Sequence, residues 1–408
     1  MIGRISQCRG CSSKNLEEVL ALRSIPIGDN LSSGVNDLPV YPLGLVLCCS
    51  CGLTQLTFTV KHEIVFEHYF SRADSKLDSY QRNQSSVPTA LNNLELKAGS
   101  TVVEIGCGWG QRLKTLFHNG TQVIGVEPSD DIARLSRNCG NKTITGYFTD
   151  DVVEEILRKY GRADLVLVDN SSSFPHPVHI SNVDDPLNYA ENLARLIKPQ
   201  GNLYLRAPYV GSIITQGLID YIYHEHQSYF SFRSLTELLS KVGLCIRTAQ
   251  ICKNDMLNAE YLITSIDNPT VSQKLTNRYQ ANESHIKLEK PETFVELSNR
   301  LSVSRIELRK ELATIKYLPI VGYGASIATV SAMYQYEIVK YLEFLVDDNA
   351  YKIGLYSPNA NLQVRSPQEI YEANAGGLVV LTSRFADMIK KKHSHFAGKI
   401  VVPQLAVH

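Results

Sequence analysis

The sequence lacks any excess of charge of one sign and any long apolar run. Lysine plus arginine number 41 in 408 residues, and aspartate plus glutamate also number 41. Balanced charge gives no global field that would attract nucleic acid or an anionic membrane. The first residues contain no apolar signal region, and no stretch is long enough to span a bilayer. We therefore expect a cytoplasmic protein that uses neither nucleic acid nor a membrane as a partner.

Nine cysteines are present, and five of them fall within the first 51 residues. Clustered thiols in a reducing compartment favour a metal over disulfides. Two Cys-x-x-Cys pairs can each present two thiolates to one tetrahedral Zn²⁺, and four thiolates leave no open position for catalysis. We predict a structural zinc site whose ligands are Cys8, Cys11, Cys48 and Cys51. Cys49 is interpreted as a bystander.

A short apolar strand with one acidic residue, Glu104, leads into three glycines spaced two apart, Gly106, Gly108 and Gly110. Glycines suit a strand-to-helix turn at which a ligand approaches the backbone closely. The dinucleotide signature would be G-x-G-x-x-G, and a carboxylate at Glu104 would repel a pyrophosphate but suits a cationic ligand. The pattern resembles the first motif of class I S-adenosylmethionine (SAM) methyltransferases. A nicotinamide site, or a turn whose glycines serve only packing, are the alternatives.

Further cofactor contacts are predicted along the alternating strand and helix pattern of residues 97–265, which indicates a doubly wound α/β sheet. Glu127 ends the second strand, where an acid would hold ribose hydroxyls. Asp150 follows the third strand, where this fold often binds the adenine amine. Asp169 and Asn170 end the fourth strand, which faces the ligand crevice.

The run Tyr223-His224-Glu225-His226, followed by Tyr229, is dense in acid–base chemistry. Histidine titrates near neutrality, and a neighbouring carboxylate or phenol can set its tautomer and basicity. The His-Glu-His spacing is too tight for the metal-binding pattern His-Glu-x-x-His. The alternative interpretation is a buried polar turn whose hydrogen bonds are satisfied.

The remaining chain is predicted to form a long connecting helix over 266–316 and a Rossmann-like α/β domain over 317–408. In that last domain Gly322-Tyr323-Gly324-Ala325 follows a strand, and Asp347 ends the next strand. This arrangement would suit a nucleotide ribose, although two glycines alone are a weak signal. The zinc-binding domain is predicted to cover 1–75, and the SAM-binding domain 76–265.

This order of parts resembles one family, the three-domain SAM-dependent C-methyltransferases of nucleotide-linked keto-deoxysugars, and the resemblance covers essentially the whole chain. The residues that carry it are the four cysteines, the Tyr-His-Glu-His run, the Gly-Tyr-Gly-Ala turn, and Val346-Asp347 with Lys352 and Gly354. The resemblance implies natural-product deoxysugar biosynthesis, with His226 as general base assisted by Glu225 and Tyr223. On this basis we assign substrate contacts to His224, Tyr229, Tyr209, Tyr323 and Asp347.

The implied reaction accounts for an acid–base apparatus of this kind. A proton on the carbon next to a ketone is acidic enough for an imidazole once the enolate is stabilised. The chain departs from the family pattern at Phe174, Arg206, Tyr209, residues 253–258 and Ala328, mostly where substrate would lie. An O- or N-methyltransferase, a C-methyltransferase of a non-sugar ketone, and a non-catalytic SAM- or nucleotide-binding partner protein therefore stay open.

Overall fold

The computed structural model describes residues 2–28, 30–66, 91, 94, 96–116, 120–169, 179–252, 257–267, 273–315 and 318–405. Asn170 and Phe174 lie outside these residues, so their predicted positions are not described.

The largest sheet has seven strands in the order β12-β13-β10-β9-β6-β7-β8. Its members are β6 (Thr101–Ile105), β7 (Gln122–Glu127), β8 (Lys142–Thr145), β9 (Ala163–Asp169), β10 (Ile197–Pro208), β12 (Leu244–Ile251) and β13 (Asn258–Ser265). The five strands from β10 to β8 are parallel, and β13 runs antiparallel to both of its neighbours. This is the doubly wound sheet of a class I SAM methyltransferase, as predicted. The strand β13, however, was not predicted.

Helices cover both faces of this sheet, which parallel strands require because both of their faces are apolar. They are α3 (Gln111–Leu116), α4 (Asp130–Asn138), α5 (Asp150–Tyr160), α6 (Pro186–Leu196) and α8 (Phe232–Ser240). Side chains at the first residues fix where two of them begin. The Ser129 hydroxyl accepts the Ile132 N–H at the start of α4, and the Asp185 carboxylate accepts two N–H groups at the start of α6.

The N-terminal region forms an antiparallel sheet in the order β11-β4-β3-β2. Its strands are β2 (Leu16–Ile25), β3 (Tyr41–Cys48), β4 (Thr54–Leu56) and β11 (Ser228–Tyr229). A two-stranded pair, β1 (Ile2–Arg4) with β5 (Phe58–Val60), and the short helix α1 (His62–Val65) lie beside it. The strand β11 comes from a distant part of the chain and pairs Ser228 with Gln55 and Tyr229 with Thr54. The Tyr-His-Glu-His run is thereby attached to the N-terminal sheet.

The connector consists of two helices, α9 (Gln273–Ile286) and α10 (Pro291–Leu312), where one long helix was predicted. The long helix predicted from the amphipathic run Phe294 to Leu312 is present as α10, but α9 is a separate helix because the chain turns between them. Lys287 has a φ of 54°, in the left-handed region that ends helices, and Pro291 occupies the first turn of α10.

The C-terminal domain is a second doubly wound unit, with five parallel strands in the order β16-β15-β14-β17-β18. The strands are β14 (Ile320–Tyr323), β15 (Phe344–Val346), β16 (Val364–Arg365), β17 (Gly377–Val380) and β18 (Lys399–Val401), with helices α11 (Ile327–Gln335), α12 (Glu369–Glu372) and α13 (Ala386–Lys392). The order 3-2-1-4-5 is Rossmann-like, so this part of the fold prediction is confirmed.

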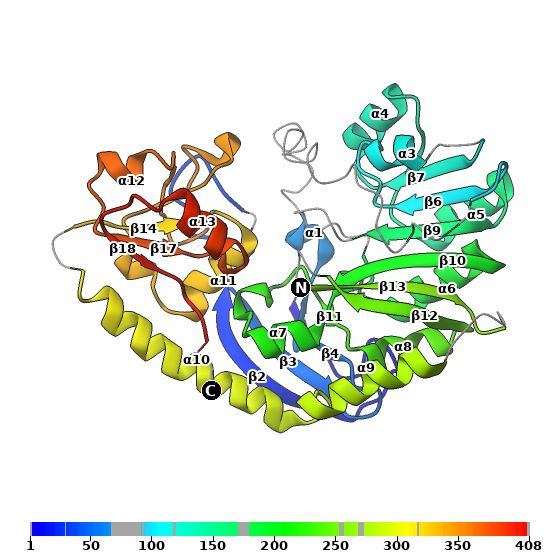
Figure 1. The fold of residues 1–408 in the computed structure, drawn as a ribbon, viewed down its shortest axis with the longest axis horizontal. Helices are drawn as coiled ribbons and strands as arrows, with labels where there is room; N and C mark the ends of the chain where they lie inside the picture. The colour runs from blue at the N-terminus through cyan, green and yellow to red at the C-terminus, as the bar shows by residue number, and fades with distance from the viewer. Residues whose placement is uncertain are drawn as a thin grey trace.

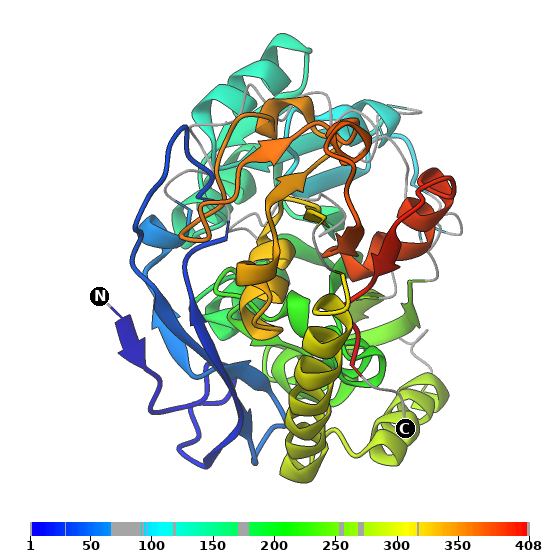
Figure 2. The ribbon, with the colours of Figure 1, turned by 90° about the vertical axis from the view of Figure 1, so that its left-hand side faces the viewer.

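The two α/β units stand on opposite sides of the molecule, joined by the N-terminal sheet and by α10 along one edge (Figure 1). A view turned by 90° shows the N-terminal strands along one side of both units (Figure 2). One cluster of buried apolar side chains runs through all three regions. No helix among the described residues is long and apolar enough to cross a membrane. The boundaries predicted at residues 75, 265 and 316 stay predictions.

Candidate active site

The four predicted zinc ligands gather at one end of the N-terminal sheet. Their sulfur atoms all lie within 4.8 Å of one another, with Cys8 Sγ 3.6 Å from Cys51 Sγ and Cys11 Sγ 3.5 Å from Cys48 Sγ. A tetrahedral Zn²⁺ with Zn–S bonds of about 2.3 Å needs sulfur–sulfur distances of roughly 3.8 Å. The donor set therefore fits one zinc ion, which would tie the turn after β1 to the end of β3. Cys49 is exposed and lies outside the cluster.

The three glycines of the predicted cofactor turn all have left-handed backbone, with φ of 74° at Gly106, 55° at Gly108 and 80° at Gly110. Only glycine adopts such a succession readily. At Gly110 a side chain would also collide, because an added Cβ would lie 2.5 Å from the Ser136 hydroxyl and would meet the Asn141 amide. The turn is thus shaped for glycine at the carboxyl edge of β6.

Glu127, at the end of β7, is fully buried and bonds to this turn. Its carboxylate accepts the Gly108 N–H at 3.1 Å and the Ser129 N–H at 2.9 Å. Burial raises the pKa of Glu127 to about 7, while these two backbone donors act to lower it. The structure therefore brings Glu127 and the glycine turn together, as a shared cofactor site requires.

A buried ion-pair group lies beneath the turn. Arg112 of α3 contacts Glu104 at 2.8 Å and Asp169 at 2.9 Å. Three buried polar atoms here lack a hydrogen-bond partner among the described residues: Glu104 Oε2, Trp109 Nε1 and Gln111 Oε1. Orphaned buried donors and acceptors are costly unless a ligand satisfies them. SAM carries an ammonium, a carboxylate and ribose hydroxyls, so these atoms fit that cofactor.

Among the described residues, Asp150 has no hydrogen bond or ion pair with the polar atoms of the glycine turn. It begins α5 on the surface, and its exposed carboxylate pairs with Arg195 of α6 at 2.9 Å. The adenine contact assigned to Asp150 stays a prediction.

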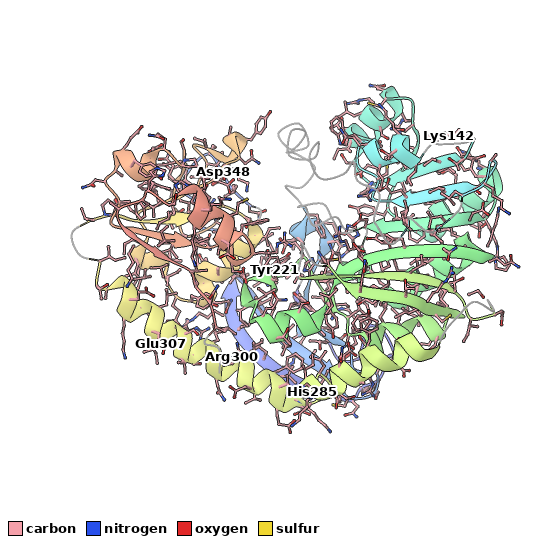
Figure 3. All side chains as sticks on the ribbon, in the orientation of Figure 1. Lys142, Tyr221, His285, Arg300, Glu307 and Asp348 are labelled. Carbon is pink, nitrogen blue, oxygen red and sulfur yellow. The ribbon has the colours of Figure 1, made fainter. Side chains whose placement is uncertain are left out.

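The Tyr-His-Glu-His run is buried and held from three sides. The Tyr223 N–H donates to the Tyr229 hydroxyl of β11 at 3.2 Å, and His224 Nε2 lies 3.2 Å from the Pro42 carbonyl of β3. From the C-terminal domain, the Ser331 hydroxyl donates to the Ile222 carbonyl at 3.0 Å. Tyr221, two residues before the run, lies between the two α/β units (Figure 3).

His226 packs between two phenols of this run. Its ring centroid lies 4.6 Å from that of Tyr223 and 6.0 Å from that of Tyr229. Burial and, to a smaller extent, His179 lower the pKa of His226 to about 3, while the Tyr221 carbonyl opposes the shift. Within the described chain, His226 Nδ1 has no hydrogen-bond partner. His226 is therefore an uncharged imidazole at neutral pH.

His179 is a site residue that the sequence analysis missed. Its turn packs on the run, because the Gln227 and Ser228 N–H groups both donate to the Ser181 carbonyl. Burial lowers the pKa of His179 to about 4, and the charge of Asp169 opposes that shift. His179 thus lies within electrostatic range both of Asp169, at the cofactor edge of β9, and of His226. The sequence offered one signal for it: the family pattern has a histidine at the place of Phe174, and this chain has a histidine five residues later, at 179.

The other predicted substrate residues are dispersed. Tyr209 packs on Phe232, with ring centroids 4.9 Å apart. Tyr323 donates its hydroxyl to Asp348 at 2.9 Å, and Asp347 accepts the Ala325 N–H at 2.8 Å. Tyr323 and Asp347 therefore adjoin the glycine turn of the C-terminal domain, and their contact with a substrate stays a prediction.

The fold and this site define a SAM-dependent methyltransferase that also carries a structural zinc cluster. Three family models match in sequence: a zinc binding domain over residues 8–66, a methyltransferase domain over 78–249, and a C-methyltransferase C-terminal domain over 262–404. The three matches follow one another along the chain in the same order as the three predicted domains, and together they cover most of it.

The chain is also similar to individual proteins. The C-methyltransferase NovU of Streptomyces niveus is 25% identical over 98% of this chain and 95% of its own length. An uncharacterized methyltransferase of a Geobacillus species is 32% identical over 20% of the chain and 40% of its own length. Among solved structures, the TehB-like SAM-dependent methyltransferase of Corynebacterium glutamicum aligns at 14% identity with a TM-score of 0.34, covering 49% of this chain and 97% of that one. The CcbJ methyltransferase of Streptomyces caelestis aligns at 14% identity with a TM-score of 0.35, covering 47% and 97%.

Proposed function

We propose that the protein methylates the carbon next to the ketone of a nucleotide-linked keto-deoxysugar. The observation that carries this proposal is the uncharged, buried imidazole of His226, which packs against Tyr223 and lies within electrostatic range of His179, itself within range of Asp169 at the cofactor edge of the SAM domain. Methyl transfer to carbon needs a base, whereas a lone hydroxyl or amine would need no base–enolate apparatus. The similarity to NovU, which is named a C-methyltransferase, supports transfer to carbon.

In this proposal His226 accepts the proton from the substrate carbon. Its low pKa leaves it without a proton at neutral pH, but proton transfer then requires negative charge near the new imidazolium. Glu225, the preceding residue, and the developing enolate provide that charge. Burial raises the pKa of Tyr223 well above its ordinary value, so its phenol keeps its proton and can donate a hydrogen bond to the enolate oxygen.

The cofactor residues act through position. The three glycines Gly106, Gly108 and Gly110 let the cofactor approach the main chain closely. Glu127 accepts hydrogen bonds from the ribose hydroxyls, which replace one of the two backbone N–H groups that it accepts in the structure. Bound SAM supplies an electrophilic methyl group on a sulfonium. Collinear placement of carbon and methyl group contributes several kcal/mol, about 7 or more in well-oriented cases.

The substrate assignments follow the same proposal. His224 belongs to the run, Tyr229 follows it, and Tyr209 follows β10; these three would contact the sugar. Tyr323 and Asp347 would contact the nucleotide from the C-terminal domain. Asp150, Asp169 and Asn170 complete the proposed cofactor contacts. Four thiolates that remain reduced to bind zinc suit the cytoplasm, which we propose as the location.

The test is methyl transfer from isotope-labelled SAM to a panel of nucleotide-linked keto-sugars, with the product analysed by NMR. We expect label on carbon next to the ketone. The variant His226→Ala should abolish transfer while SAM binding is retained, and His285→Ala should leave transfer unchanged because His285 is exposed at the end of α9, on the outer side of the molecule (Figure 3).

Each contrary outcome selects a different function. A base-labile or nitrogen-linked methyl group would identify an O- or N-methyltransferase, and transfer only to simpler ketones would remove the sugar. Tight SAM binding with no transfer to any acceptor, unaffected by His226→Ala, would identify a non-catalytic binding protein.

A further inference from the structure

Arg112 is a buried arginine at the cofactor turn, on the first turn of α3 and two residues after the last glycine of the turn. Its side chain is only 4% exposed, yet arginine stays protonated in proteins. A buried charge of this kind is stable only when opposite charges and hydrogen bonds surround it. Arg112 satisfies this condition by contacting Glu104 of β6 and Asp169 of β9, the ends of two adjacent parallel strands.

A second arginine shares part of this arrangement. Arg206 of β10 lies 3.6 Å from Asp169 Oδ1 and 3.3 Å from Glu260 Oε1 of β13. Asp169 therefore has two cationic neighbours, but of these two arginines only Arg112 is paired with Glu104. With all five groups ionised, the three carboxylates and two guanidinium groups leave one negative charge unbalanced, which a cationic ligand would offset.

The geometry at Glu104 shows where that charge is available. Arg112 Nη1 contacts Glu104 Oε1, at 2.8 Å, and so leaves the second oxygen unshared. Glu104 Oε2 is buried and has no hydrogen-bond partner in the described part of the chain. It lies two residues before Gly106, at the start of the turn whose shape admits a ligand.

We propose that Arg112 is a positioning residue for the methyl donor: it holds Oε1 of Glu104 and thereby keeps Oε2 directed at the donor's ammonium group. The proposal concerns the amino acid end of SAM and does not depend on the identity of the methyl acceptor.

The electrostatics around Glu104 support this role. Burial raises the pKa of Glu104 to about 7, Arg112 opposes that rise, and Asp169 adds to it. Burial raises the pKa of the Cys107 thiol, and the charges of Glu127 and Glu104 both raise it further. Arg206 and Tyr204 of β10 act electrostatically on Arg112. The Glu104 pKa of about 7 already includes the lowering by Arg112, so without Arg112 the pKa of Glu104 would rise further and its carboxyl group would be protonated at neutral pH.

Calorimetry on the full-length, zinc-loaded protein tests the proposal with two ligands. S-Adenosylhomocysteine carries the ammonium group, and 5′-methylthioadenosine lacks the whole amino acid end. We expect Arg112→Met to weaken S-adenosylhomocysteine at least tenfold at pH 7 and methylthioadenosine less than threefold. Arg112→Lys should recover most of the difference, and Arg134→Met, which removes an exposed arginine of α4, should change neither affinity.

A proton measurement separates positioning from a general structural loss. Repeating the titration in buffers of different ionisation enthalpy should show that Arg112→Met releases more protons on binding S-adenosylhomocysteine than the wild type does. If Arg112→Met fails to fold, Glu104→Gln with Arg112 intact should show the same ligand-selective weakening. Equal weakening of both ligands, or unchanged binding of S-adenosylhomocysteine by Glu104→Gln, would overturn the proposal.

Discussion

Gly110 shows how a single missing side chain shapes the cofactor turn. Both Gly110 and Gly140 have left-handed backbone, at φ of 80° and 86°, so alanine at either site costs about 1–2 kcal/mol of strain. At Gly140 an added Cβ would meet nothing within 4 Å, whereas at Gly110 it would meet Ser136 and Asn141. We predict that Gly110→Ala weakens SAM binding at least tenfold in calorimetry, because the turn must shift to admit the methyl group.

Gly140→Ala is the matched control for that prediction. It should lower the melting temperature by the strain alone and leave SAM binding intact. Equal losses of SAM affinity in the two variants would mean that backbone strain, and not the contact with Ser136 and Asn141, decides the shape of the turn.

The buried histidines give the protein a predictable acid sensitivity. The pKa of His179 is lowered to about 4 in the folded protein, against about 6.5 when exposed. Between these values the unfolded chain binds the extra proton, so the free energy of unfolding falls as the pH decreases through this window. The contribution of His179 is on the order of 2–3 kcal/mol, and His224 and His226 act in the same direction.

We predict that His179→Asn reduces the loss of stability between pH 7 and pH 5, as measured by urea unfolding at each pH. The test is the change of the unfolding free energy with pH, because a packing change at residue 179 would shift the values at pH 7 and pH 5 equally. His285→Asn, which makes the same replacement at an exposed histidine, is the matched control and should keep the wild-type slope. An unchanged slope in His179→Asn would contradict the assignment of His179 as an uncharged buried group.

At the scale of elements, a zinc ion bound by the four cysteines would stabilise the N-terminal sheet to which the Tyr-His-Glu-His run is attached. Cys48 ends β3, and β3 pairs with β4, which in turn pairs with β11 of the catalytic segment. Loss of a thiolate therefore acts on the Tyr-His-Glu-His run through two strand pairings. We predict that Cys48→Ser lowers the zinc content and the unfolding free energy by several kcal/mol, of the order of 3–5, and abolishes methyl transfer.

SAM binding should survive in Cys48→Ser, because the glycine turn belongs to a different sheet. Cys49→Ser is the control: this exposed neighbour lies outside the cluster, so its zinc content, measured by elemental mass spectrometry, and its stability should match the wild type. Retained zinc in Cys48→Ser would contradict the four-thiolate site.

Local patterns in the sequence predicted most elements, and the failures have physical causes. The apolar strand before Gly106 and the Cys-x-x-Cys pairs were sufficient for the SAM fold and the zinc cluster. The pairing of β11 with β4 could not be predicted, because two residues carry no periodicity and their partner lies about 170 positions away. The break between α9 and α10 was not predicted because the residue with left-handed backbone there is Lys287, and no glycine marks the position. His179 was missed because its site is assembled by a turn, at no fixed spacing from Asn170.

At the scale of the whole molecule, the Tyr-His-Glu-His run belongs to no single unit. Its hydrogen bonds reach β3, β11 and α11, and the hydroxyl of Ser383 donates to the buried Asp220 carboxylate at 2.9 Å just before the run. The cofactor turn, by contrast, is built from the SAM sheet alone. SAM binding and catalysis should therefore respond differently when the N-terminal sheet and the C-terminal domain are loosened from each other.

Gln335, at the end of α11, is the place to test this separation. Its buried side chain accepts the Arg23 N–H at 2.9 Å and donates to the Arg23 carbonyl at 3.0 Å, which joins the C-terminal domain to β2. Gln335→Ala leaves both backbone groups without this partner, so we predict a loss of about 1–3 kcal/mol in urea unfolding. Because α11 also carries Ser331, which holds Ile222, methyl transfer should fall more than SAM affinity. Gln368→Ala, on an exposed glutamine of the same domain, should change neither quantity, and equal losses of transfer and SAM affinity in Gln335→Ala would show that the cofactor turn depends on this junction too.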